Sequence, residues 1–117
     1  MPNFAGSARS CLRCVAQDLG RGVFRVALAG NLDIATARQA DRALCATQAD
    51  ARLVILDLRQ VQFIGSTASR VAGMADARAR RAGSRLVVVA APAPALRLFA
   101  LKRLHRGLEI VERSRAA

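Results

Sequence analysis

Two short apolar runs with a helical repeat between them constrain the fold of this chain most. The runs cover residues 53–58 and 85–89, and their nearly continuous apolar character is typical of strands covered on both faces. Between them, apolar residues recur at steps of three and four, which predicts a helix over 66–82 that stops at Gly83. This repeat consists of Ala68, Val71, Ala72, Ala75, Ala79 and Ala82. A strand, a helix and a second strand predict a parallel pair joined by a right-handed crossover.

The N-terminal half adds a hairpin and another helix. Residues 11–18 and 23–29 have strand character, and the turn residues 19–22 between them predict an antiparallel hairpin. A helix is expected over 35–49, because small and apolar residues recur there at helical spacing. The stripe of this helix is Ala37, Ala40, Leu44 and Thr47.

The C-terminal third predicts one more helix and one more strand. Pro94 suits the first position of a helix, where its missing N–H does no harm, and that helix is expected to run to Lys102 or Leu104. Residues 108–111 predict a short last strand. The whole pattern predicts a single α/β domain with a mixed, mostly parallel sheet of about five strands and three to four helices.

Length and hydropathy agree with one domain. The chain has 117 residues, of which 53% are apolar, so one packed core is expected over 11–112 between flexible tails at 1–10 and 113–117. No apolar run reaches the roughly 18–20 residues of a membrane-spanning helix. The N-terminus also lacks the apolar core of a signal peptide. We therefore expect a cytoplasmic protein that does not insert into a membrane.

The net charge of +11 raises the question of a nucleic-acid partner. The chain carries 19 Lys and Arg against 8 Asp and Glu, but its basic residues are scattered along the sequence. It has four Phe and no Tyr or Trp, so it offers few aromatic platforms for stacking bases. We therefore expect no nucleic-acid binding, although the charge favours encounter with an acidic protein.

Candidates for chemistry are few. Cys11, Cys14 and Cys45 are an odd number of cysteines, which predicts reduced thiols. The C-x-x-C of Cys11 and Cys14 hints at zinc or redox chemistry, but residues three apart on a strand face opposite sides. His105 is the only histidine, and no phosphate-binding glycine motif is present. Asp57 is interpreted as a polar residue at a strand end. We expect neither an enzyme nor a bound metal or cofactor.

Two adjacent hydroxyls, Ser66 and Thr67, stand where the loop after the 53–58 strand enters the 66–82 helix. One interpretation is capping, in which either hydroxyl accepts an N–H of the first helical turn. The other is phosphorylation, because a helix N-terminus favours an anion and a phosphate adds about −1.5 to −2 charges at neutral pH. Local sequence favours capping.

Three blocks of this sequence resemble the STAS domain family, which is named for sulfate transporters and anti-sigma factor antagonists. Residues 30–37, GNLDIATA, are similar to the family's G-x-L-D-x-x-T/S-A turn. Residues 53–81 are similar to its central strand, loop and helix, which carry a D-S-S/T-G signature. Residues 91–101 resemble a later P-x-V-x-R-x-L helix. The likeness covers about residues 11–112.

The resemblance implies an anti-sigma factor antagonist. Such an antagonist binds an anti-sigma factor that is also a serine/threonine kinase, and phosphorylation of the second signature hydroxyl breaks the complex. That hydroxyl corresponds to Thr67, with Ser66 the less favoured acceptor. The signature is altered here, because Gly65 stands for its Asp, Ala68 for its Gly and Ser69 for the following Leu.

The altered signature keeps an alternative open, in which the domain is a constitutive docking subunit of a larger assembly. A lipid-transport ATPase or a stressosome would be such an assembly, and no phosphorylation would be needed. In both cases the resemblance and helical geometry place the partner on one surface, and the sequence also leaves a weak homodimer open. The expected partner-binding residues are Asp33, Gly65, Ser66, Thr67, Arg70, Met74 and Arg78.

Overall fold

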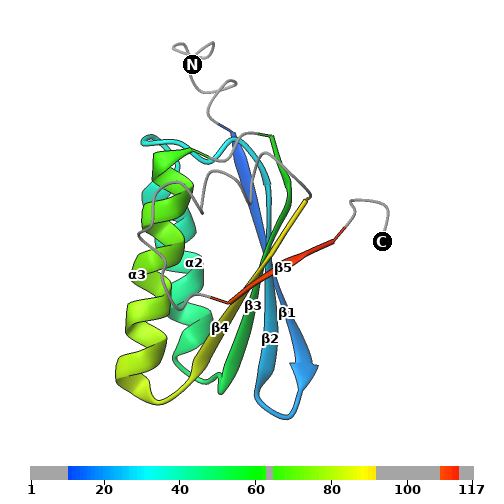
Figure 1. Ribbon diagram of the computed structural model, residues 1–117, viewed down its shortest axis with the longest axis vertical. Helices are drawn as coiled ribbons and strands as arrows, with labels where there is room; N and C mark the ends of the chain where they lie inside the picture. The colour runs from blue at the N-terminus through cyan, green and yellow to red at the C-terminus, as the bar shows by residue number, and fades with distance from the viewer. Residues whose placement is uncertain (1–10, 63–64, 92–108, 114–117) are drawn as a thin grey trace.

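The computed structural model of the protein describes residues 11–62, 65–91 and 109–113, and Figure 1 shows its arrangement. The described elements are β1 Leu12–Gly20, β2 Val23–Gly30, α2 Ala37–Gln48, β3 Leu53–Val61, α3 Ser66–Ala82, β4 Arg85–Ala90 and β5 Glu109–Glu112. The strands form one sheet in the order β1-β2-β3-β4-β5. β1 pairs antiparallel with β2, and the other three pairings are parallel. The predicted α/β fold with a mixed, mostly parallel sheet is confirmed.

The hairpin of β1 and β2 turns through residues with positive φ. Gly20, Arg21 and Gly22 have φ of 90°, 59° and 78°, a region that glycine enters without steric cost. Cys14 lies opposite Leu28 in the register, and Ala16 lies opposite Val26. The predicted hairpin is therefore confirmed, with the turn where the glycines placed it.

The helix α2 begins later than the sequence pattern indicates, at Ala37. The Oδ1 of Asp33 accepts hydrogen bonds from the N–H groups of Ala35 and Thr36, at 3.0 and 3.2 Å. The Thr36 hydroxyl donates to the Asn31 carbonyl at 2.8 Å. These bonds hold residues 33–36 in a turn, as Asp often does in loops, so the helix starts only after it.

The core lies between the sheet and the two described helices, which pack on the same face (Figure 1). The predicted apolar stripe of α3 is buried except at Ala82, the last residue of the helix, which is exposed. Ser69 is buried although the pattern placed it outside the stripe. Gly83 ends α3 with φ of 75°, and the Ser84 N–H bonds to the Ala79 carbonyl at 2.8 Å, which confirms the predicted stop.

The opposite face of the sheet is covered by neither α2 nor α3 (Figure 1). Ile55, Val87 and Val89 on that face are half-buried, so β3 and β4 are not fully buried on both faces as expected. Asp57 lies on that face within β3, which extends to Val61, so it is not a strand-end residue. Its carboxylate pairs with Arg25 at 2.6 Å and with Arg59 at 2.8 Å, and only 5% of the Asp57 side chain is exposed. Burial raises the pKa of Asp57, but the hydrogen bonds from Arg59 and Arg25 outweigh it and hold the pKa at about 2.

Several expectations fall on parts of the chain that lie outside the described residues. These are the helix from Pro94 to Lys102 or Leu104, His105, the tail over 1–10 and residues 114–117. The domain limits therefore stay a prediction. In the described ranges there are two helices, and neither has the length and apolar character of a membrane span.

Candidate functional site

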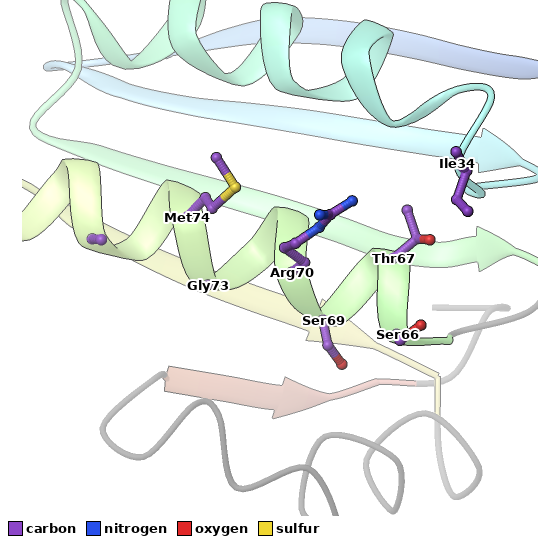
Figure 2. A pocket seen from close by; sticks show the side chains of 8 residues that line it. Ile34, Ser66, Thr67, Ser69, Arg70, Gly73 and Met74 are labelled. Carbon is purple, nitrogen blue, oxygen red and sulfur yellow. The ribbon is translucent and has the colours of Figure 1, made fainter.

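A groove of about 630 Å³ runs along α3 from Ser66 to Ala77, next to the loop that follows β2. Figure 2 shows that Ile34 approaches it from this loop and that Thr67, Arg70 and Met74 project from α3 toward the same side. Ile34 is 82% exposed and Met74 is 47% exposed, which is unusual for apolar side chains of their size. The groove is lined by Ile34, Ser66, Thr67, Ser69, Arg70, Gly73, Met74 and Ala77.

The first turn of α3 is not capped by a side chain. Gly65 is the N-cap residue, with extended backbone, so Ser66 and Thr67 are the first two helical residues. Neither hydroxyl forms a hydrogen bond with any residue that the structure describes, and the capping interpretation is wrong. Neither hydroxyl can cap the helix, because a capping hydroxyl must belong to the residue before the first helical residue, and that residue is Gly65. Thr67 is half-buried at the groove, whereas Ser66 is exposed.

The three further α3 residues expected at the partner surface do not behave alike. Arg70 and Met74 line the groove and are exposed. Arg78 does not line it, because its Nε donates to Oε1 of Gln48 on α2 at 3.0 Å. Gln48 in turn donates to the Ala75 carbonyl at 2.9 Å, so Arg78 belongs to the seam between the two helices. Helical spacing gives a residue's angle on its own helix but not the neighbour that its side chain meets.

Asp33 and Gly65 border the groove without lining it. The Asp33 carboxylate is half-buried and accepts the N–H groups of the turn before α2, so part of its hydrogen-bonding capacity is used locally. This turn displays the neighbouring Ile34 to solvent. Asp33 thus positions a loop residue of the groove, and Gly65 sets the start of the helix that carries Thr67.

Sequence reasoning missed four lining residues, namely Ile34, Ser69, Gly73 and Ala77. Ile34 carried a usable signal, since an isolated large apolar residue inside a turn sequence has no core position to fill. Ser69 carried none, because its burial depends on what packs beside α3. Its Oγ is buried without a hydrogen-bond partner among the described residues.

The structure gives little support for metal or redox chemistry at the C-x-x-C cysteines. Cys11 is exposed, whereas Cys14 packs against the core from β1. Burial raises the pKa of the Cys14 thiol, and its hydrogen bond with Gln39 opposes this only in part. A raised pKa lowers the thiolate fraction and with it the reactivity of the thiol.

The family model described as Mlab, STAS domain, matches residues 15–112. The chain belongs to the STAS domain family. This STAS domain shares its fold with solved anti-sigma factor antagonists at low sequence identity. A search of the curated proteins found no match to the sequence.

Three solved structures illustrate the shared fold. An anti-sigma factor antagonist from Mycobacterium paratuberculosis has 23% identity and a TM-score of 0.78, over 87% of this chain and 86% of that one. The antagonist SpoIIAA in its unphosphorylated form has 14% identity and a TM-score of 0.70, over 89% and 90%. The Bacillus cell fate determinant SpoIIAA in its phosphorylated form has 16% identity and a TM-score of 0.67, over 89% and 94%.

Proposed function

We propose that this STAS domain is an anti-sigma factor antagonist that binds an anti-sigma factor kinase and releases it when Thr67 is phosphorylated. The observation that carries the proposal is the position of Thr67, uncapped in the first turn of α3 and directly on the groove. Its hydroxyl has no structural hydrogen bond to lose among the described residues. The antagonist SpoIIAA, which has this fold, has been solved both without and with phosphate.

The groove has the chemistry of a docking surface. Ile34 and Met74 offer exposed apolar side chains, and methionine adapts readily to a partner's shape. Arg70 beside them adds a cation of the type enriched at interface hot spots. A partner that fits this surface needs an apolar contact with acidic groups beside it.

The same chemistry explains how a phosphate would break the complex. A phosphate on Thr67 adds about −1.5 to −2 charges at neutral pH, next to Arg70. It offsets the cation that attracts the partner and repels the partner's acidic groups, while its own desolvation opposes burial in the interface. Control therefore needs no change of fold.

Variants of Thr67 test the switch. Thr67→Glu is expected to weaken binding of the anti-sigma factor kinase by at least about tenfold, or roughly 1.4 kcal/mol, whereas Thr67→Ala stays within about twofold of wild type. Calorimetry with the purified kinase measures both, and mass spectrometry after incubation with the kinase and ATP locates the phosphate at Thr67 or Ser66. Wild-type affinity of both variants, without phosphate on either residue, would contradict the switch.

Arg70 tests the docking surface separately from phosphorylation. Arg70→Ala is expected to weaken binding, and the loss should shrink as salt rises because the interaction is electrostatic. Arg80→Ala is the matched control, since Arg80 lies on another flank of α3 and pairs with Asp76 at 2.8 Å. An equal loss in both variants would show that the groove is not the docking surface.

A constitutive docking subunit is the second candidate function. The altered signature favours it, because Gly65 and Ala68 replace residues expected around a phosphorylated hydroxyl, and the matching family model carries the Mlab description. A lipid-transport ATPase or a stressosome is the type of assembly meant. In that case Arg70→Ala weakens assembly as above, and no kinase modifies Thr67.

A further inference from the structure

The two edge strands of the sheet differ in how they are protected from pairing. In the described part of the sheet, β1 pairs only with β2 and β5 pairs only with β4. β5 has four residues, of which Glu109 and Glu112 are charged, and short charged edges resist further pairing. β1 has nine residues, and its Val15 and Leu19 are 51% and 47% exposed. The β1 edge is therefore the one that remains able to accept a strand.

The ladder with β2 fixes which backbone groups of β1 point outward. The Asn31 N–H donates to the Cys11 carbonyl at 2.9 Å, and these residues continue the β1–β2 register. In an antiparallel pair, residues whose backbone groups bond to the neighbouring strand alternate with residues whose backbone groups point away from it. The odd-numbered residues of β1 therefore bond to β2, and the N–H and C=O groups of the even-numbered residues point outward. A hydrogen bond from α2 is consistent with this alternation, since Nε2 of Gln39 donates to the outward-pointing carbonyl of Leu12 at 2.8 Å. Cys14 and Ala16 thus present their N–H and C=O groups at the edge.

We propose that β1 binds β1 of a second copy of this chain, antiparallel and with the two-fold axis at Val15. In this register Cys14 of each copy lies opposite Ala16 of the other, so the outward N–H and C=O groups satisfy one another. Val15 then faces Val15 of the second copy in a pair without hydrogen bonds, where side chains approach most closely. This contact buries the most exposed large apolar side chain of the strand.

The neighbouring registers fit less well. An axis at Cys14 would set Ala16 opposite Leu12, whose carbonyl already accepts the bond from Gln39. An axis at Ala16 would set Cys14 opposite Asp18, where the β1–β2 ladder is shifted. The Asp18 carboxylate also accepts the Gly20 N–H at 2.8 Å there. The axis at Val15 sets Leu12 and Asp18 opposite each other at the ends of the contact, so both central pairs of Cys14 with Ala16 are free of them.

A second copy suits this edge because the antiparallel pairing is self-complementary. The outward backbone groups of Cys14 and Ala16 on one strand meet those of Ala16 and Cys14 on the other, and the two exposed Val15 side chains cover each other. The assignment is independent of the function proposed for the groove.

A proline tests the edge without touching the hairpin. Ala16→Pro removes an N–H that points away from β2, and edge strands tolerate proline at such positions. Sedimentation velocity is expected to show a concentration-dependent dimer for wild type and loss of that dimer in Ala16→Pro, with unchanged circular dichroism. Ala16→Thr, the matched control, keeps the N–H and should keep the dimer. A monomeric wild type at every concentration, or an Ala16→Pro dimer as tight as wild type, would overturn the proposal.

Disulfide trapping tests the register. In a chain carrying Cys11→Ser, Cys14→Ala and Cys45→Ser, Val15→Cys should form a cross-linked dimer on mild oxidation, because facing residues of this kind meet disulfide geometry. Val111→Cys is the matched control on the sheet face away from the helices, where Val111 is 36% exposed. Cross-linking through Val111 rather than Val15 would place the interface on the sheet face and contradict the edge.

Discussion

The Asp57 carboxylate is held by two arginines on the sheet face that neither described helix covers. Its pKa is about 2 in the folded protein against a usual value of 3.8, so folding favours the ionised form. This stabilisation is present above pH 3.8 and is lost as the pH falls through about 2. We expect Asp57→Asn to cost about 2 kcal/mol of unfolding free energy at pH 7, since it removes the carboxylate that pairs with Arg25 and Arg59.

Urea unfolding at several pH values measures this cost. The difference between wild type and Asp57→Asn should shrink as the pH falls through about 2 and approach zero below it, because the wild-type carboxylate is then protonated as well. Asp76→Asn is the control, since its i,i+4 pair with Arg80 is exposed and contributes only about 0.5 kcal/mol. A difference that does not depend on pH would assign the effect to packing instead of charge.

The sequence could not predict this ion cluster, because the partners of Asp57 depend on register. Arg25 lies 32 residues away and meets Asp57 only because β2 and β3 pair in parallel with Ala27 opposite Asp57. The same limit applies to Arg78, whose angle on α3 was predictable but whose bond to Gln48 depends on how α2 packs. Thr67 could be found because its position beside a helix start is local.

At the scale of elements, two glycines differ in what their backbone tolerates. Gly83 ends α3 with φ of 75°, and a Cβ there would meet nothing within 4 Å. Gly30 ends β2 with φ of 110°, and a Cβ there would lie 2.5 Å from the Cys11 carbonyl oxygen. Gly83→Ala should therefore cost only the left-handed backbone strain, about 1 kcal/mol. Gly30→Ala adds a backbone clash and should cost roughly 2–4 kcal/mol.

Chemical denaturation of the two variants compares these costs directly. The clash at Gly30 also opposes the bond from Asn31 to Cys11, so its variant should lose order at the start of β1, visible as faster amide exchange there. Equal destabilisation by both substitutions would mean that strain, and not the close approach of β1, explains Gly30.

The elements themselves were largely predictable because their signals are periodic and local. The α3 bounds Ser66–Ala82 follow from a long stripe and from Gly83, and the hairpin follows from its glycine turn. The start of α2 was misplaced because the Asp33 carboxylate accepts the N–H groups of the turn that follows it, and this holds residues 33–36 out of the helix. An apolar repeat in the sequence does not indicate such a bond. Coverage of the sheet was misjudged for a similar reason, since half-buried valines beside Asp57 look like buried ones in sequence.

For the whole molecule, the fold separates the groove from the β1 edge. Most of the groove lies on α3, which packs on β4, and Ile34 reaches it from the loop after β2, whereas α2 packs on α3, β1 and β2 and so lies between α3 and the β1 edge. Pairing through β1 therefore leaves both grooves of a dimer free. A dimer with two free grooves binds an immobilised partner bivalently where the partner is dense, and this slows its release.

Two variants test whether the surfaces are independent. Ala16→Pro should bind the anti-sigma factor kinase in solution within about twofold of wild type, since each groove is intact, but it should leave a densely coated surface faster. Thr67→Glu should lose kinase binding and keep the dimer. Surface plasmon resonance at low and high partner density, combined with sedimentation of each variant, separates the two effects. Loss of the dimer in Thr67→Glu, or loss of solution affinity in Ala16→Pro, would mean that groove and edge are coupled through the sheet.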